Sequence, residues 1–245
     1  MQMKELKEKK DQYNIVLFGD SIAKGVIFDP VKGKYAVLKN SFAQLVQARI
    51  KGQIHNAGRF GSVITKGLST LQRDVISKRP DIAVLEFGGN DCDFNWDEIA
   101  RDPDREYSPN TTLNAYITSL KEMIGTLREQ GIVPVLMTLP PLDPDKYFKW
   151  VSKDDELSAQ NILKWLGTVS RIYWWHERYN AALMQVAEEM KVRWIDIRGA
   201  FLSTHDYREY ICEDGIHPNE KGHQLIANKI IHYMENNYNN MLRLV

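Results

Sequence analysis

The sequence predicts an α/β domain built on a parallel β-sheet. Two observations lead to this fold class: short apolar segments rich in β-branched residues recur along the chain, and longer segments with the helical spacing of apolar residues separate them. This alternation is typical of β-α units joined by right-handed crossovers. A chain of 245 residues is also long enough to bury about 70% of its unfolded surface in one core.

Five segments carry the strand pattern, which is enough for a three-layer domain with helices on both faces of the sheet. The expected strands are residues 13–18, 53–56, 82–87, 133–138 and 192–196. Five helices are expected from apolar residues three or four positions apart. Their apolar stripes are Phe42, Leu45, Val46 and Ile50; Leu68, Leu71, Val75 and Ile76; Leu113, Ile117, Leu120, Ile124 and Leu127; Leu183, Val186, Ala187 and Met190; and Leu225, Ile226, Ile230 and Tyr233.

The ends of some helices are also marked in the sequence. Ser41 is expected to cap the first helix, and Gly52 to end it. Gly131 is expected to end the third helix, and the last helix is expected to start near Asn219. The Asn-rich segment 236–240 is expected to fray.

One stretch, residues 140–175, does not fit the alternation. It contains a Pro-Pro pair, charged clusters and the aromatic residues Tyr147, Phe148, Trp150, Trp165, Tyr173, Trp174 and Trp175. Because no linker and no separate core pattern precede it, we expect an elaborated loop with one or two helices, inserted into a single domain that spans residues 1–245. Its aromatic residues either pack onto the core or form a platform for sugar rings, and core packing is the more common role.

Composition excludes several classes of protein. The 32 basic and 32 acidic residues give no net positive field for nucleic acid, and the apolar runs are far shorter than the roughly 18 residues of a membrane-spanning helix. The charged start, MQMKELKEKKDQ, lacks the apolar segment of a secretion signal. We therefore expect a cytoplasmic protein with a small-molecule partner, in which Cys92 and Cys212 are thiols. The sequence leaves the oligomeric state open.

Two polar clusters follow expected strands, at the sheet edge where ligands bind in open α/β folds. Gly19-Asp20-Ser21 comes directly after residues 13–18, so the serine hydroxyl is expected to project from this edge. Gly88-Gly89-Asn90-Asp91 follows residues 82–87, and the Asn90 amide is a neutral donor suited to an oxyanion. Gly58, after the second strand, is able to add a backbone N–H. Each cluster alone is also compatible with an ordinary turn.

A third cluster, Asp214-Gly215-Ile216-His217-Pro218, precedes the last helix. A carboxylate three residues before a histidine is able to hold the imidazole Nδ1–H and leave Nε2 free to accept a proton. Four other histidines, His55, His176, His205 and His232, lack a carboxylate at this spacing. Ser21, Asp214 and His217 therefore form a candidate catalytic triad.

The motifs together resemble the SGNH hydrolases, also called GDSL esterases and lipases. Ser21, Gly58, Asn90 and the pair Asp214 and His217 lie in four short blocks that occur in the order of that family. The α/β-hydrolase fold is disfavoured, because Ala23 stands where its nucleophile elbow has a final glycine. Ile22 replaces the leucine that names the GDSL family, a change that conserves volume.

The resemblance implies a flavodoxin-like three-layer α/β/α fold with strand order 2-1-3-4-5. It implies Ser21 as nucleophile, His217 as general base and then acid, and Asp214 as the residue that orients the imidazole. The oxyanion hole would consist of Ser21 N–H, Gly58 N–H and the Asn90 side chain. Asp20 is expected to fix the turn, and no metal or cofactor is expected.

The expected function is hydrolysis of carboxylic esters through an acyl-enzyme, with short acyl groups such as acetyl on a carbohydrate or another polar alcohol. A lysophospholipase or thioesterase is the alternative within the same chemistry. A non-catalytic ligand-binding module and a carrier protein modified at Ser21 are disfavoured. The segment around Asp91, Asp93 and Asn95 starts like a calcium loop, but Trp96 replaces the required glycine.

Overall fold

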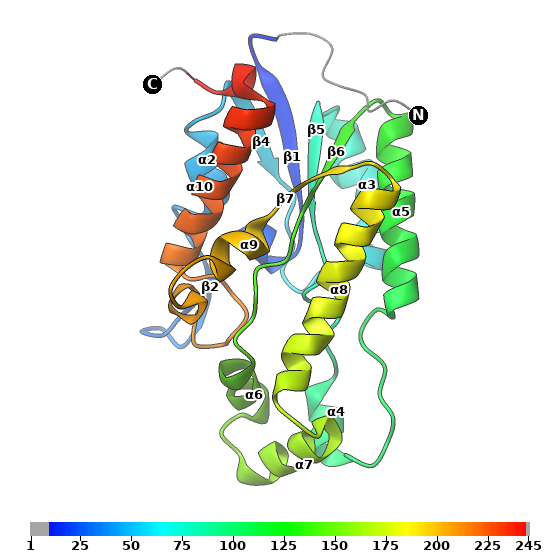
Figure 1. Ribbon diagram of the computed structural model, residues 1–245, viewed down its shortest axis with the longest axis vertical. Coiled ribbons are helices and arrows are strands. Elements are labelled where there is room, and N and C mark those ends of the chain that lie inside the picture. Colours follow the sequence, from blue (N-terminus) through cyan, green and yellow to red (C-terminus); the bar gives the residue numbers. More distant parts are fainter. Residues whose placement is uncertain (1–9, 244–245) are drawn as a thin grey trace.

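The computed structural model describes residues 10–243 and confirms the predicted α/β fold with a five-stranded parallel sheet. The strands are β1 (Tyr13–Gly19), β4 (Gly52–Asn56), β5 (Ile82–Glu86), β6 (Val133–Met137) and β7 (Arg193–Ile195). They lie in the order β4-β1-β5-β6-β7 (Figure 1), which is 2-1-3-4-5 when only the strands of this sheet are counted. The charged N-terminal segment that we read as lacking a secretion signal lies mostly outside the described residues.

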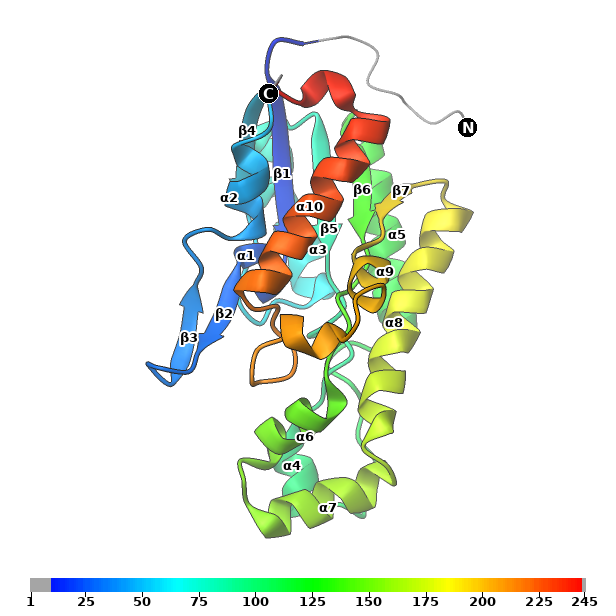
Figure 2. The same cartoon turned by 60° about the vertical axis from the view of Figure 1, so that its left-hand side comes forward.

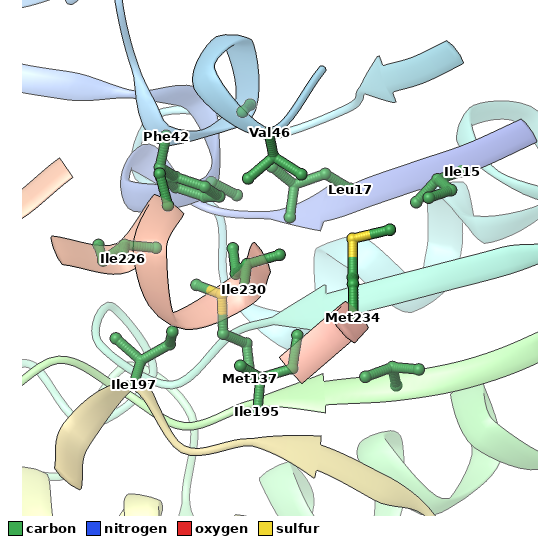
Figure 3. Close-up of a cluster of buried hydrophobic side chains, with 14 of the residues drawn as sticks. Ile15, Leu17, Phe42, Val46, Met137, Ile195, Ile197, Ile226, Ile230 and Met234 are labelled. Atoms are coloured by element: carbon green, nitrogen blue, oxygen red, sulfur yellow. The ribbon is translucent and has the colours of Figure 1, made fainter. Parts of the chain in front are cut away.

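Helices cover both faces of the sheet (Figures 1 and 2). One layer consists of α2 (Phe42–Gln47), α9 (Ile197–Leu202) and α10 (Glu220–Asn237), and the other of α3 (Ile64–Asp74), α5 (Leu113–Glu129) and α8 (Ser170–Glu189). Along β1, Ile15 and Leu17 face the first layer, whereas Val16 and Phe18 face the second. Figure 3 shows the first of these two cores, where Ile15 and Leu17 meet side chains of α2 and α10. Both faces of the strands are therefore buried, as expected for a parallel sheet.

Helix ends agree with the sequence at some positions and differ at others. Asn219 caps α10 by accepting a hydrogen bond from Gly222 N–H, and Gly131 follows α5 with a φ of 75°. Ser41 occupies the cap position of α2, but its side chain makes no capping bond. Gly52 does not end that helix; it begins β4, where a Cβ atom would lie 1.9 Å from the backbone of Tyr13.

A two-stranded hairpin stands away from the sheet and was not predicted. Strands β2 (Val26–Asp29) and β3 (Lys34–Val37) pair in antiparallel fashion, and Figure 2 shows them beside the one-turn helix α1 (Ser21–Lys24). The turn is closed by Asp29, whose side chain accepts the N–H groups of the two residues after Pro30. Each of these strands has only four residues, and most of their side chains are only partly buried.

The insertion at 140–175 forms part of a helical lobe, which we define as α4 (Trp96–Arg101), α6 (Pro144–Ser152), α7 (Glu156–Leu166) and the first turns of α8. Figure 1 shows the lobe beyond the carboxyl ends of the strands. It has its own buried cluster, consisting of Phe94, Trp96, Ile99, Leu142, Tyr147, Ile162, Leu166 and Ile172. Three members come from residues 94–99, far away in the sequence, so the sequence of the insertion alone shows no complete core pattern.

The Asn-rich end does not fray as expected. A short 3₁₀ helix over Asn239–Met241 follows α10, and Met241 is fully buried. Leu242 forms a β-bridge with Ile50, which ties this end of the chain to the segment before β4. The apolar residues just after the asparagines decide the structure of this segment.

Candidate active site

Ser21 lies where β1 ends and α1 begins, as the sequence predicts. Asp20 caps this turn, because its Oδ1 accepts a hydrogen bond from Ile22 N–H at 2.8 Å. Gly19 is required for the close approach of β1 to β5, since a Cβ atom there would lie 2.2 Å from the carbonyl oxygen of Glu86. Within residues 10–243, the Ser21 N–H has no hydrogen-bond acceptor. The turn therefore presents both the hydroxyl and a free N–H.

His217 and Asp214 lie next to Ser21, although 193 residues separate Asp214 from it in the sequence. His217 Nε2 is 2.8 Å from Ser21 Oγ, and His217 Nδ1 is 2.5 Å from Asp214 Oδ2. Asp214 is fully buried, and its Oδ1 accepts the backbone N–H groups of Ile216 and His217, each at 3.1 Å. An ionised carboxylate only accepts hydrogen bonds, so Nδ1 carries a proton and Nε2 is free to accept the Ser21 hydroxyl proton.

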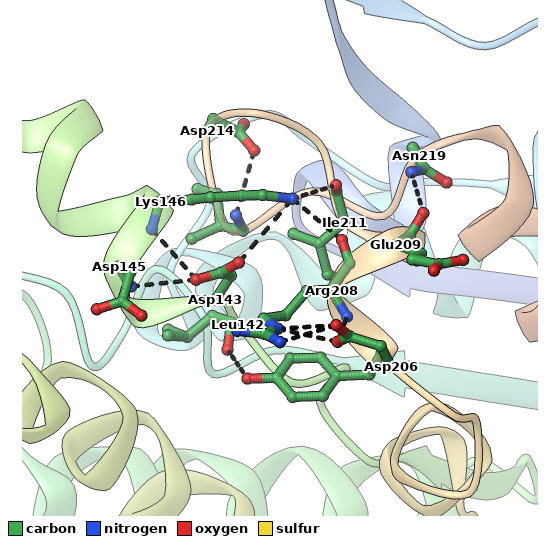
Figure 4. Close-up of polar contacts among 12 residues, drawn as sticks. Leu142, Asp143, Asp145, Lys146, Asp206, Arg208, Glu209, Ile211, Asp214 and Asn219 are labelled. Carbon is green, nitrogen blue, oxygen red and sulfur yellow. Dashed lines mark hydrogen bonds and ion pairs between the residues drawn. The ribbon is translucent and has the colours of Figure 1, made fainter.

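The loop that carries His217 is fastened to α6 of the helical lobe. Asp143 N–H donates to the carbonyl of Gly215 at 2.8 Å. Gly215 has a φ of +79°, and a Cβ atom there would lie 2.4 Å from Tyr147 N. Lys146 Nζ donates to the carbonyls of Arg208 and Ile211, at 3.0 and 3.2 Å, as Figure 4 shows. The position of the histidine therefore depends on the lobe as well as on the sheet.

Asn90 follows β5 and is held beside the serine turn. Its Nδ2 donates to Asp20 Oδ2 at 3.0 Å. A side-chain amide has two N–H donors, so one remains for another acceptor. The next residue, Asp91, is buried and accepts Ile64 N–H at the start of α3, and burial raises its pKa to about 6. Asn90 thus sits on a loop that is fixed from both sides.

Gly58 lies against α1, but its N–H is already in use. This N–H donates to Asn56 Oδ1 at 2.9 Å, while Asn56 Nδ2 donates to the carbonyl of Ala23 at 2.7 Å. A Cβ atom at Gly58 would lie 2.4 Å from Lys24 N, so glycine is required for this approach. The structure gives Gly58 a packing role, and its part in an oxyanion hole stays a prediction that requires this N–H to be shared.

A cavity leads from Ser21, Asn90 and His217 into the helical lobe. It encloses about 720 Å³ of space free of protein atoms, part of it open to solvent. Its walls are mainly apolar and aromatic. They include Phe94, Trp96, Leu142, Trp165, Leu166, Ile172, Trp175 and Ile216. The aromatic insertion therefore both packs the lobe and lines the approach to the serine.

Further polar side chains line this cavity, among them Asp93, His176 and Arg171. Asp93 is engaged by two donors, Trp96 Nε1 at 2.7 Å and Tyr147 Oη at 2.8 Å. His176 is buried and lies 3.4 Å from Arg198 Nη1 through its Nδ1. Because arginine only donates, Nδ1 accepts, and burial together with Arg198 lowers the pKa of His176 to about 3. His176 is therefore neutral. Arg171 lines the same cavity.

Aromatic rings surround His217 on the side of the hairpin. The ring centroid of Tyr35 is 5.2 Å from that of His217, and Phe60 stacks on the imidazole at 6.2 Å. Phe28 and Trp150 complete this group, which we call the aromatic roof. Phe60 is 58% exposed, so the roof borders solvent. The sequence signals a platform in residues 147–175, but half of the roof comes from the unpredicted hairpin.

Glu86 is a residue of the site that sequence reasoning missed. It is fully buried, and its Oε2 accepts Ala23 N–H of α1 at 3.2 Å. Burial and the adjacent Asp20 raise the pKa of Glu86 well above its usual range. A single acidic residue inside the apolar run of β5 was the signal that was available.

The two cysteines are buried free thiols near the site. Burial raises the pKa of Cys92 well above its usual range and that of Cys212 to about 11. Among residues 10–243, no three His, Cys, Asp or Glu side chains are grouped to hold a metal ion. No helix in that part of the chain has the length and apolar character needed to cross a membrane.

Two plant proteins are similar to this chain over most of its length. It is 22% identical over 220 residues to the GDSL esterase/lipase CPRD49 of Arabidopsis thaliana. The aligned region covers 89% of this chain and 77% of that relative. It is 24% identical over 225 residues to the GDSL esterase/lipase WDL1 of Oryza sativa subsp. japonica, and the aligned region covers 90% of this chain and 76% of that relative.

Solved structures share the fold. The lipase/acylhydrolase from Enterococcus faecalis superposes with a TM-score of 0.66 at 21% identity, covering 95% of this chain and 98% of that one. A catalytic mutant of Axe2, an acetylxylan esterase from Geobacillus stearothermophilus, superposes with a TM-score of 0.61 at 19% identity, covering 92% and 95%.

The sequence as a whole also matches a protein family. The match to the GDSL-like Lipase/Acylhydrolase family extends over residues 17–225. This range includes Ser21, Asn90, Asp214 and His217. The chain therefore belongs to the GDSL-like lipase/acylhydrolase family of serine ester hydrolases.

Proposed function

We propose that Ser21, His217 and Asp214 catalyse ester hydrolysis as a triad, and the observation that carries this proposal is the 2.8 Å distance from Ser21 Oγ to His217 Nε2. His217 accepts the hydroxyl proton as Ser21 Oγ attacks the ester carbonyl. The protonated imidazole is stabilised by Asp214 and then donates that proton to the departing alcohol. A water molecule, activated by His217 in the same way, cleaves the acyl-enzyme.

The developing oxyanion is stabilised by donors that do not titrate. Ser21 N–H is free, and the second Nδ2–H of Asn90 is available beside it. Donors that are already oriented need no rearrangement during the reaction, and each one contributes about 10²-fold or more to the rate. Gly58 N–H is a third donor if its bond to Asn56 is shared.

As substrates we propose esters of short acyl groups, such as acetyl, on a carbohydrate or another polar alcohol. The mixture of aromatic walls with the donors Arg171 and His176 in one cavity supports a sugar-like group. Aromatic faces pack against the apolar faces of sugar rings, and the donors match hydroxyl oxygens. Axe2 from Geobacillus stearothermophilus, which has the same fold, is an acetylxylan esterase.

Longer acyl groups are the second candidate, because one observation favours them. Most of the cavity wall is apolar, which suits the acyl chain of a lysophospholipid or a thioester. A binding module without turnover would leave the Ser21–His217–Asp214 arrangement unused.

A single experiment distinguishes hydrolysis of short acyl esters, hydrolysis of longer acyl esters and binding without turnover. Initial rates are measured on aryl esters from acetyl to octanoyl, on acetylated sugars and on a lysophospholipid, for the parent protein and for Ser21→Ala. We expect activity that depends on Ser21 and is highest for acetyl esters. A preference for octanoyl esters would overturn the substrate proposal, and hydrolysis that is equal in the Ser21→Ala protein, or absent from the parent protein, would overturn the catalytic one.

A further inference from the structure

Two carboxyl groups are buried directly beneath the serine turn, and neither belongs to the triad. Asp20 is 1% exposed and Glu86 is 0% exposed. Asp20 N–H donates to the backbone carbonyl of Glu86 at 3.3 Å, where β1 and β5 end side by side. The two side chains also contact each other. At this depth water does not screen two negative charges, so at most one of the two carboxyl groups is ionised.

The hydrogen bonds around the pair show which group carries the charge. Asp20 Oδ1 accepts Ile22 N–H at 2.8 Å, and Asp20 Oδ2 accepts Asn90 Nδ2–H at 3.0 Å. Glu86 Oε2 accepts Ala23 N–H at 3.2 Å, but Glu86 Oε1 is buried with no donor near it. Such an oxygen is satisfied when it carries a proton and donates it to the neighbouring carboxylate. The proton therefore belongs on Glu86 and the negative charge on Asp20.

We propose that Glu86 is a protonated positioning residue, whose hydroxyl group donates to Asp20 so that the ionised Asp20 holds the Asn90 amide and the start of α1 in place beside Ser21. This inference rests on the proposed function, because Ser21 and Asn90 are the groups that the carboxyl pair holds in place. The proton stays on the carboxyl pair throughout turnover, so nothing is exchanged with the substrate. Glu86 acts through Asp20 and Asn90 and does not touch the substrate.

The surroundings favour a single charge on the pair. Burial, followed by the charge of Asp20, raises the pKa of Glu86 well above its usual range. The other titratable groups that interact with the pair are His217, Asp91, Cys92 and Tyr116. Of these four groups, only His217 becomes positively charged when it binds a proton, and that charge favours the ionised form of Asp20. Loss of the Glu86 proton would therefore put a second negative charge beside the donors of the oxyanion hole.

The proposal has a thermodynamic consequence with a definite sign. Above the ordinary range of a glutamate, the unfolded chain has lost the Glu86 proton while the folded protein keeps it. The folded state is then destabilised as the pH rises, and the unfolding equilibrium constant increases up to tenfold per pH unit until the folded protein also loses this proton. Replacement by glutamine keeps a donor toward Asp20 and removes this dependence.

The test compares an amide substitution at each carboxyl group. Glu86→Gln preserves the proposed hydrogen bond, so we expect kcat within about threefold of the parent value and retention of activity at alkaline pH where the parent declines. Asp20→Asn brings an amide donor against Asn90 and Glu86, so we expect kcat to fall at least tenfold while KM changes less. Glu129→Gln, on the exposed end of α5, is the control and is expected to match the parent.

Two further measurements need no substrate and therefore judge the pair even if the protein hydrolyses no ester. An infrared spectrum at neutral pH should contain the carbonyl band of a buried protonated carboxyl group, and this band should be absent from Glu86→Gln. Chemical unfolding across the pH range should show the ratio of the parent's unfolding constant to that of Glu86→Gln rising with pH. A folded Glu86→Gln protein as impaired as Asp20→Asn, a missing band, or a constant ratio would each overturn the proposal.

Discussion

The carboxyl edge of the sheet and the helical lobe meet at one cavity, but they hold their side chains by different means. At the edge, the turn that carries Ser21, together with Asn90 and Asp214, is fixed by hydrogen bonds to backbone groups or buried carboxylates. In the lobe, side chains such as Phe94 and Trp165 are held by ring contacts, here with centroids 5.0 Å apart. Hydrogen bonds specify direction, whereas apolar packing specifies volume.

This difference separates chemistry from substrate choice. The sheet edge supplies the atoms that we propose to react, and their directions leave little freedom. The lobe supplies most of the aromatic side chains of the cavity wall, where similar volumes are interchangeable. Substitutions at the edge are therefore expected to change turnover, and substitutions in the lobe to change local stability and substrate range. The four predictions below test this separation, in order of decreasing effect.

Removal of the nucleophile is expected to have the largest effect. In Ser21→Ala, the esterase rate should fall about 10³-fold or more, because the triad acts as a unit. The melting temperature should stay close to that of the parent, since Ser21 Oγ contacts only His217 Nε2 among the hydrogen bonds described. Rates on an aryl acetate and thermal unfolding measure the two quantities. A variant that keeps a tenth of the parent rate would contradict the assignment.

A cavity in the lobe core should loosen the lobe without loosening the sheet. Ile162 is fully buried in the lobe, so Ile162→Ala is expected to cost about 3 kcal/mol of local stability. Hydrogen exchange should then become faster in α4, α6 and α7. Ile226→Ala is the matched variant in the core beneath the sheet, where burial is also complete. If Ile162→Ala speeds exchange in β1 and β5 as much as in the lobe, the two regions unfold together.

The loop that joins the two regions provides a third test. Gly215→Ala places a Cβ atom 2.4 Å from the backbone of α6, at a positive φ that alanine tolerates poorly. His217 should move relative to Ser21, and kcat/KM should fall about 10- to 30-fold. Gly125→Ala in α5 is the control, because a Cβ atom there meets nothing within 4 Å. An unchanged kcat/KM for Gly215→Ala would mean that the lobe does not position the histidine.

The smallest effect concerns acid stability at the cavity wall. The pKa of His176 is lowered to about 3 by burial and Arg198, so the unfolded chain binds a proton below about pH 6.5 while the folded protein does not. The contribution of His176 to the free energy of unfolding is therefore present above that pH and is lost as the pH falls. Between pH 7 and 5.5 the loss is about 1 kcal/mol. Urea unfolding of His176→Gln should lack this part of the acid dependence, and an identical dependence in both proteins would refute the prediction.

Much of the sheet and the arrangement of Ser21, Asp214 and His217 was predictable because the signals are local. Strands β1, β5 and β6 contain short apolar runs, and the carboxyl ends of neighbouring parallel strands share one edge. Asp214 and His217 lie three residues apart, so one turn sets their geometry. Ser21 was placed by the strand before it. The four sequence blocks that identify the family resemblance coincide with these local signals.

Other features depend on contacts between segments that are distant in the sequence. The lobe core needs residues 94–99 against residues 142–172, and neither segment shows a complete apolar pattern alone. The hairpin becomes part of the aromatic roof only where Phe28 and Tyr35 meet Trp150. Gly58 was assigned a free N–H, but the side chain of Asn56 folds back to accept it.

The sequence by itself determined the fold class, the strand order through its family resemblance, and the residues that we propose as the triad, because these follow from local periodicity and short motifs. The tertiary structure decided which groups are charged and what encloses the substrate. Glu86 became part of the site only when β5 placed its carboxyl group against Asp20, away from water. Protonation state and cavity shape depend on burial and on neighbours from other elements, and linear order does not encode either directly.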